Sequence, residues 1–228
     1  MKKIQLSLLV VIMLCFVTKS FSQHGTVDIK NGIGLFGGIS QFDIITDNFE
    51  TTKGDGWIGG MSATVELPHK WYNASYGMQL AENKISVSGR ISNTDLSAEA
   101  LEYKIFTVQV VYLWHAKIFG DFLTFDFGPM LQYNSDLELI NDQQENFLVN
   151  NYNALTASDI TKISAFNANG AVGLTAGVSI IKFRAQYIYG FTNTLNKLNS
   201  NDDIDLTGNS TKFKGNQSML TFSAMISF

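Results

Sequence analysis

The sequence is poor in residues that crosslink a chain or interrupt regular backbone, with one cysteine and two prolines among 228 residues. Only 16% of the residues are charged and 45% are apolar, whereas a disordered chain carries much charge and little apolar surface. No internal repeat is evident. Basic residues are also scarce: 16 Lys and Arg against 20 Asp and Glu give a net charge of -4, and no basic patch is found. These features predict one folded domain and exclude nucleic acid as a partner.

The first 22 residues have the features of a secretory signal peptide. Two lysines precede the apolar run Ile4–Val17, which is shorter than the roughly 20 residues that a membrane-spanning helix needs. Small residues place the cleavage site after Ser22, so the expected domain comprises residues 23–228. Retention as a membrane anchor is the alternative. A lipoprotein is disfavoured because Cys15 lies in the middle of the apolar run and does not follow small residues.

Cleavage would remove the only cysteine and three of the lysines. The remaining 13 basic residues (16 minus 3) face 20 acidic ones, which gives a net charge of -7. An exported chain without cysteine has no disulfides, so its stability must come from burial in protein or in lipid.

Beyond residue 31 the dominant pattern is a period of two, which places alternate side chains on opposite faces of a strand. At the C-terminus, Leu220, Phe222 and Ala224 alternate with Thr221 and Ser223. Eight such segments are predicted, at residues 32–45, 57–67, 72–80, 106–114, 123–133, 166–178, 181–192 and 219–228. Most of these segments reach the length of roughly 9 to 11 residues that a bilayer-crossing strand needs. In the first segment the apolar phase changes near Gly37 and Gly38, which predicts a β-bulge.

The polar face of these segments decides between two kinds of barrel. The residues of this face are small and mostly neutral, as a narrow lumen requires. A soluble barrel would instead turn its apolar face inward and carry charge outside. Aromatic residues lie near strand ends on the apolar face, as an interfacial girdle requires. They are Trp57, Tyr72, Trp114, Phe125, Tyr133, Phe166, Phe191 and Phe228. The pattern therefore favours an all-β, eight-stranded antiparallel up-and-down transmembrane β-barrel, with a soluble barrel as the alternative.

The predicted connections alternate strictly between long and short. The long ones are Thr46–Asp55, Asn83–Ala98, Ser135–Ile160 and Thr194–Phe213, and the short ones are Pro68–Lys70, Lys117–Asp121 and Ser179–Ile181. Outer-membrane barrels have long extracellular loops and short periplasmic turns. We therefore expect a location in the cell outer membrane with both termini in the periplasm. The final aromatic residue, Phe228, is the expected C-terminal signal for the outer-membrane assembly machinery.

Two stretches resemble the PorT-like outer-membrane β-barrel family of Bacteroidota. Leu123-Thr124-Phe125-Asp126-Phe127-Gly128-Pro129 is similar to an aromatic, acid, Gly-Pro stretch of the family's fifth strand. Ala185-Gln186-Tyr187-Ile188-Tyr189-Gly190-Phe191-Thr192-Asn193 is similar to its seventh strand, with Gln186 where the family often has Arg. The resemblance covers the mature chain and implies a small outer-membrane barrel. The family's namesake participates in type IX secretion, so the resemblance also implies a secretion role as one possible function.

Inward-facing polar residues are the candidate site. The interior of an eight-stranded barrel is just wide enough for side chains to fill it, so no permanent pore is expected. The predicted lumen residues are Glu66, Gln79, Lys104, Gln109, Asp126, Gln132, Asn167, Asn169, Lys182, Arg184 and Gln186. Asp126 and Arg184 are expected to share one network, because a lone charge in a low-dielectric interior costs several kcal/mol. This network is predicted to keep the barrel in shape, and a proton or solute path is the alternative.

The sequence offers no convincing metal or catalytic site. The stretch Asp203, Asp205 and Thr207 copies the start of a calcium loop, but Lys214 takes the place of its final Glu, so a solvated acidic loop is expected. The histidines His24, His69 and His115 lack metal-ligand spacing, and none is predicted at the extracellular rim. No cofactor fingerprint or nucleophile elbow occurs.

The sequence therefore predicts a non-enzymatic envelope protein without cofactors. Its partners would be outer-membrane lipid, the assembly machinery and an extracellular ligand or protein held by loops Ser135–Ile160 and Thr194–Phe213. A small porin or solute carrier, and a component of a secretion machine, are the alternatives.

Overall fold

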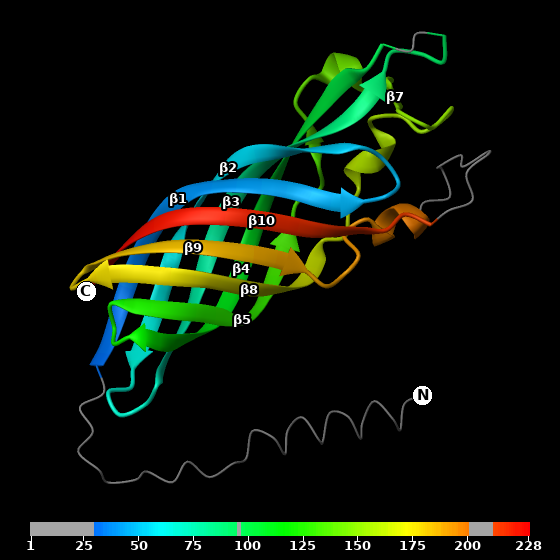
Figure 1. Ribbon diagram of the computed structural model, residues 1–228. Coiled ribbons are helices and arrows are strands. Elements are labelled where there is room, and N and C mark those ends of the chain that lie inside the picture. Colours follow the sequence, from blue (N-terminus) through cyan, green and yellow to red (C-terminus); the bar gives the residue numbers. More distant parts are fainter. Residues whose placement is uncertain (1–29, 95–96, 201–211) are drawn as a thin grey trace, which may run out of the picture.

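The computed structural model describes residues 30–94, 97–200 and 212–228 (Figure 1). The signal-peptide prediction and the calcium-loop residues Asp203, Asp205 and Thr207 lie outside these residues. The long strands are β1 (Lys30–Thr46), β2 (Thr51–Glu66), β3 (Tyr72–Arg90), β4 (Glu99–Phe119), β5 (Leu123–Asn134), β8 (Phe166–Val178), β9 (Ile181–Gly190) and β10 (Gly215–Ser227). The short elements are β6 (Glu138–Leu139), η1 (Asp142–Gln144), β7 (Leu148–Val149), η2 (Asp159–Thr161) and η3 (Asn196–Ser200). Within the described ranges, no helix is long and apolar enough to cross a membrane.

The eight long strands form a closed antiparallel barrel. Each strand pairs with the next long strand along the chain, and β10 returns to pair with β1 over thirteen residue pairs, from Gly34–Ser227 to Thr46–Gly215. Closure leaves the backbone polar groups of these strands paired within the ring. The predicted eight-stranded antiparallel up-and-down barrel is therefore confirmed.

Short turns lie at one end of the barrel and long connections at the other. The turns between β2 and β3, β4 and β5, and β8 and β9 lie at the end where β1 begins and β10 ends. At the opposite end, the hairpin of β3 and β4 projects beyond the other strands and carries β6 and β7 on its two sides (Figure 1). We call the half of the barrel near the start of β1 and the end of β10 the terminal half, and the other the cap half.

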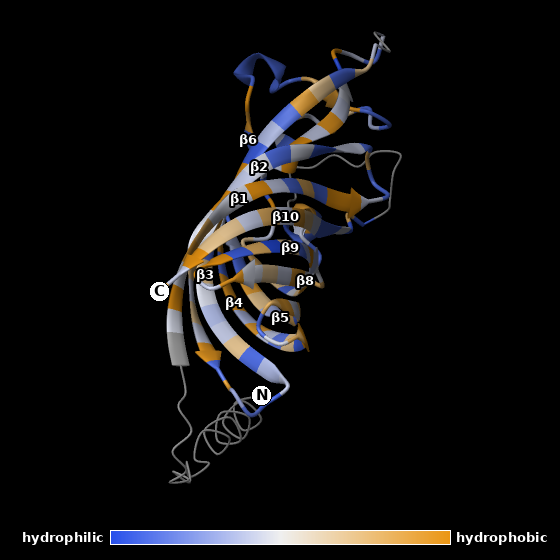
Figure 2. Ribbon diagram, turned by 60° about the vertical axis from the view of Figure 1, so that its left-hand side comes forward, coloured by the Kyte–Doolittle hydropathy of each residue, from blue (hydrophilic) through white to orange (hydrophobic). Residues whose placement is uncertain are grey.

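The two halves have opposite polarity, which β3 shows most clearly. In the terminal half, Tyr76 and Met78 point outward and are 62% and 50% exposed, while Ser75 and Gln79 point inward and are buried. Beyond Ala81 the pattern inverts: the charged residues Glu82 and Lys84 point outward, and Ile85 and Val87 are buried inside. In Figure 2, apolar and polar residues alternate along the strands.

Exposed aromatic side chains lie at both edges of the apolar outer surface. One set follows the edge toward the cap half: Trp57, Phe106, Tyr133, Phe166 and Phe191. The other set flanks the short turns and the C-terminus: Trp71, Phe119, Phe122 and Phe228. Between them the outer surface is apolar, with Ile33, Leu35, Met61, Val110, Leu131 and Phe183 at least half exposed. A band of this kind between two aromatic girdles is typical of transmembrane barrels.

The polarity inversion corrects three sequence-based predictions. β3 continues to Arg90 and β4 begins at Glu99, so half of the predicted loop Asn83–Ala98 is strand. The predicted loop Thr46–Asp55 shrinks to residues 47–50 for the same reason. The bulge predicted at Gly37 and Gly38 is wrong, because β1 keeps unbroken register there with both of its neighbours. The apolar residues of β1 change face beyond Ile39, at Phe42 and Ile44, since the interior of the cap half is apolar.

Candidate functional site: a closed lumen beneath an apolar cap

Asp126 is the centre of a charged cluster inside the terminal half. It is fully buried on β5, and its Oδ2 lies 3.4 Å from Nε of Arg184 on β9. Thr175 on β8 donates to the same oxygen and accepts a hydrogen bond of 3.0 Å from Arg184. Thr124 donates to Oδ1 at 2.8 Å. The pairing matters because breaking a buried ion pair by removing one partner leaves an uncompensated charge.

The cluster continues from Asp126 to His115 and Ser75. Oδ1 of Asp126 accepts a hydrogen bond from Nδ1 of His115 at 2.7 Å, and Oγ of Ser75 lies 2.7 Å from Nε2 of the same ring. This connectivity is that of a catalytic triad. The adjoining cavity, lined by His115 and Arg184 among others, measures about 30 Å³, which is the space of a single water and not of an acyl substrate. The three side chains are therefore placed to tie β3, β4 and β5 together.

A second network of amides spans the lumen nearer the cap. Gln132 on β5 lies at its centre, where its Oε1 accepts hydrogen bonds from Gln109 at 2.6 Å, Asn169 at 2.8 Å and Gln217 at 2.9 Å. Gln109 in turn accepts a hydrogen bond from Gln79. Because β5 and β10 are not neighbours in the ring, the contact between Gln132 and Gln217 crosses the interior. Side chains thus fill the lumen at this level.

The predicted lumen residues lie in different places. Asp126 and Arg184 are brought together, and Gln186 is buried on the inner face of β9 with its Nε2 unpaired. Glu66 and Lys182 lie near the terminal mouth, and neither forms an ion pair with a residue that the structure describes. The prediction for Lys104 is wrong: it lies on the outer face of β4 and pairs with Glu138 at 3.1 Å, because this part of β4 belongs to the cap half.

Ser75, Thr124, Thr175 and His115 belong to the cluster although none is among the predicted lumen residues. Parity along the strands carries the signal for His115, which is an even number of residues from Thr107 and Gln109 and therefore shares their inward face. The same rule relates Ser75 to Gln79 on β3. Parity alone does not reveal that these side chains converge, because that depends on the register between strands.

An apolar cap closes the barrel above the amide network. Loop residues from three segments pack onto the inward apolar residues of the strands in one buried cluster. The cluster includes Phe42, Ile44, Ile85, Leu101, Tyr103, Ile105, Val149, Leu155, Ile160, Ile163, Leu195, Leu198 and Phe213. The segment Asn141–Asn153 contains η1 and β7. The cap is thus a packed structure and not a set of free loops.

Hydrogen bonds and ring contacts fix the cap to the barrel. Tyr103 on β4 donates its hydroxyl to the carbonyl of Ala157 at 2.9 Å, and burial, with Asp159 nearby, raises the pKa of this phenol. The rings of Tyr152 and Phe213 stack with centroids 6.1 Å apart. These contacts join the connection between β5 and β8 to β4 and to the segment that leads into β10.

The rim of the cap carries a polar depression beside the connection between β1 and β2. Two adjoining cavities, of about 600 and 420 Å³, share Asp47 and Asn48 in their lining. Asn48 lines both cavities and accepts a hydrogen bond of 2.9 Å from the backbone of Lys214. Lys212, Lys214 and Glu50 supply charge of both signs around it. Among the described residues, no group of His, Cys, Asp and Glu side chains could hold a metal ion.

Similarity to known proteins is found among solved structures. No family model and no curated protein matches the sequence. Among solved structures, the crystal structure of Neisserial surface protein A (NspA) aligns with a TM-score of 0.48 and 9% identity, covering 87% of this chain and 97% of that one. The Yersinia pestis outer membrane protein Ail in a phospholipid nanodisc aligns with a TM-score of 0.40 and 12% identity over 87% and 100% of the two chains. The crystal structure of Ail gives 0.41 and 10% over 87% and 99%.

Proposed function

We propose that this protein is a non-enzymatic outer-membrane β-barrel with a closed lumen, which presents a rigid cap for binding. The observation that carries the proposal is the inversion of polarity along single strands. The outer surface is mainly apolar in the terminal half, where lipid would cover it, and carries charged residues in the cap half, where water would cover it. A soluble barrel would have no reason to change its outer surface at one level of the strands that continue past the aromatic edge.

The cap half faces the outside of the cell in this proposal, and the terminal half ends in the periplasm. The longer connections and the ordered cap lie at one end, as in barrels with extracellular loops, and the short turns lie at the other. Phe228 extends the pairing of β10 with β1 through its backbone bonds to Ile33 and stays exposed on the outer face. It is therefore available to the assembly machinery as a terminal signal.

Engineered cysteines test this orientation in whole cells. Gln143 in η1 and His69 in the turn between β2 and β3 are both exposed, at opposite ends of the barrel. Q143C should react with a membrane-impermeant maleimide on intact cells, and H69C only after the outer membrane is permeabilised. The opposite labelling pattern would reverse the orientation. If the protein is in the outer-membrane fraction and neither cysteine is labelled on intact cells, surface display is contradicted.

The closed lumen separates this function from that of a porin. Two side-chain networks and an apolar cap lie in series along the interior, so the path for a hydrated solute is blocked. In planar bilayers the purified protein should give no steady conductance. A stable open channel would make the small porin the better assignment.

Gel mobility of the outer-membrane fraction with and without boiling tests the barrel itself. A closed barrel in lipid resists SDS until it is heated, so a shift in mobility on boiling is expected. Recovery of the protein in the soluble periplasmic fraction would overturn the proposal.

A further inference from the structure

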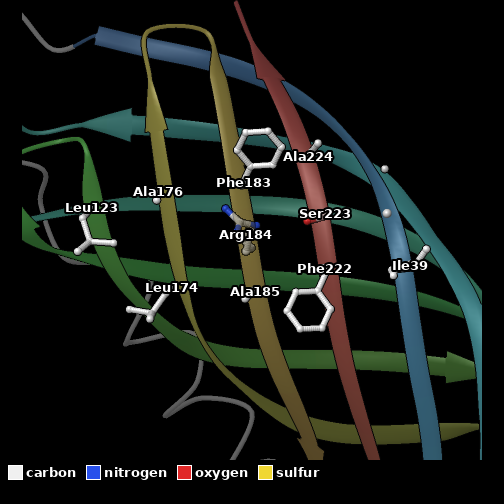
Figure 3. Close-up of a pocket in the computed structure, with 12 residues that line it drawn as sticks. Ile39, Leu123, Leu174, Ala176, Phe183, Arg184, Ala185, Phe222, Ser223 and Ala224 are labelled. Atoms are coloured by element: carbon white, nitrogen blue, oxygen red, sulfur yellow. The ribbon is translucent and has the colours of Figure 1, made fainter.

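An apolar cavity of about 590 Å³ lies on the outer face of the terminal half (Figure 3). It is formed where outward side chains of β1, β8, β9 and β10 and the first residue of β5 come together. The lining residues are Gly37, Gly38, Ile39, Leu123, Leu174, Ala176, Phe183, Arg184, Ala185, Phe222, Ser223 and Ala224. Its volume falls within the roughly 300–1,000 Å³ that small-molecule sites occupy. We call this cavity the acyl groove.

The groove owes its shape to a run of small residues between large ones. Strand register places Ala224 beside Phe183 and Ala185 beside Phe222, so each small residue is next to a ring on the adjacent strand. In Figure 3 the rings of Phe183 and Phe222 stand on either side of this low strip, with Ile39 on the side of β1. The two rings are 63% and 51% exposed, so the other residues that the structure describes leave the groove open.

Chemistry and position narrow the occupant to one class. The side chains that project into the groove are apolar, since Arg184 and Ser223 point into the lumen and are buried there. The groove lies in the apolar band near the turn between β8 and β9, so a water-soluble ligand would not reach it. Twelve lining residues are too few for a stable second copy of the chain, which needs about 20 to 30 residues on each side.

We propose that the acyl groove binds one acyl chain of a phospholipid from the leaflet next to the periplasm. This inference rests on the proposed outer-membrane location and orientation. The small residues let the acyl chain lie against the strands, and the two rings limit the sideways motion of the acyl chain. The bound phospholipid therefore exchanges more slowly than lipid elsewhere around the barrel.

Native mass spectrometry of the purified barrel, delipidated in detergent and reloaded with dipalmitoylphosphatidylethanolamine, tests the proposal. The wild-type protein should retain one phospholipid. Ala224→Phe fills the groove and should lower its occupancy about tenfold or more, which corresponds to about 1.4 kcal/mol of binding free energy. Ala185→Phe should lower the occupancy in the same way, and it tests the proposal independently if Ala224→Phe does not assemble.

Ala63→Phe is the matched control. Ala63 faces outward on β2, beside Ile33 and Tyr76, and lies outside the groove. This variant should retain the phospholipid as the wild type does. Equal phospholipid retention by all variants would overturn the proposal, and so would loss of the phospholipid from the control variant as well. A dimer that A224F converts to monomers would also overturn it, because the groove would then be an interface between copies.

The mobility shift on boiling separates failure of the groove from failure of the proposed function. A protein that shifts on boiling but retains no phospholipid is a barrel without this site. A protein that is soluble and does not shift removes the membrane location, on which the groove depends.

Discussion

The terminal half and the cap half are built from the same strands, yet they solve opposite packing problems. In the terminal half the interior is held by hydrogen bonds and one buried ion pair, and the apolar residues face outward. In the cap half the interior is an apolar core and the charges face outward. The comparison teaches that the surroundings of a strand, and not the strand itself, decide which of its two faces is apolar.

The largest expected effect comes from the ion pair of the terminal half. Asp126→Asn leaves Arg184 buried without a counter-charge, so we expect a loss of about 3–5 kcal/mol in the free energy of unfolding. Urea unfolding of the barrel in lipid vesicles, followed by tryptophan fluorescence, measures it. The double variant D126N/R184Q should recover part of the loss. A change below about 1 kcal/mol in D126N would show that hydrogen bonds alone hold the cluster.

A charge placed on the outer face tests where the two halves meet different solvents. Val172 lies in the middle of β8 and is 46% exposed on the apolar face, while Ser86 faces outward on β3 in the cap half. Val172→Arg should cost about 2–4 kcal/mol in vesicles, the range measured for arginine near the bilayer midplane. Ser86→Arg should change stability by less than about 0.5 kcal/mol. Equal costs at the two positions would remove the boundary between the halves.

The strand pattern of the terminal half could be predicted from the sequence because one rule, apolar outside and mostly small or polar inside, dominates from each short turn to the aromatic edge. Leu113, Met130 and Ile188 are inward apolar exceptions. The rule fails in the cap half. Ile85 and Val87 continue β3 with the apolar phase reversed, so the alternation of Tyr76 and Met78 breaks off and the strand seems to end. The same reversal in β1, at Phe42 and Ile44, has the appearance of a bulge.

The candidate site could be predicted only in part, for a related reason. Asp126 and Arg184 follow from parity together with the cost of a buried charge. The position of Lys104 does not follow from parity, because polar residues face inward in the terminal half and outward in the cap half. The convergence of His115 and Ser75 on Asp126 depends on register across three strands, which no local pattern records.

A smaller effect is expected at the hydroxyl that joins β4 to the cap. Tyr103→Phe removes the hydrogen bond to Ala157 and should cost about 1 kcal/mol at neutral pH. Because the pKa of Tyr103 is raised in the folded state, the unfolded chain loses this proton first, above about pH 10. Wild-type stability should therefore fall more steeply than that of Y103F above this pH. Parallel curves would show that the phenol is not desolvated in the cap.

The smallest effect is expected at the ion pair on the outer face of the cap half. Lys104 and Glu138 lie 3.1 Å apart, as close as a buried pair would be, but their side chains are 42% and 70% exposed. Water and salt screen such a pair, so Lys104→Gln should cost less than about 1 kcal/mol, and the loss should shrink further at high salt. Measured beside D126N under the same conditions, it compares one kind of contact in the two halves. A loss as large as that of D126N would mean that the outer face of the cap half is covered, and would assign a partner to it.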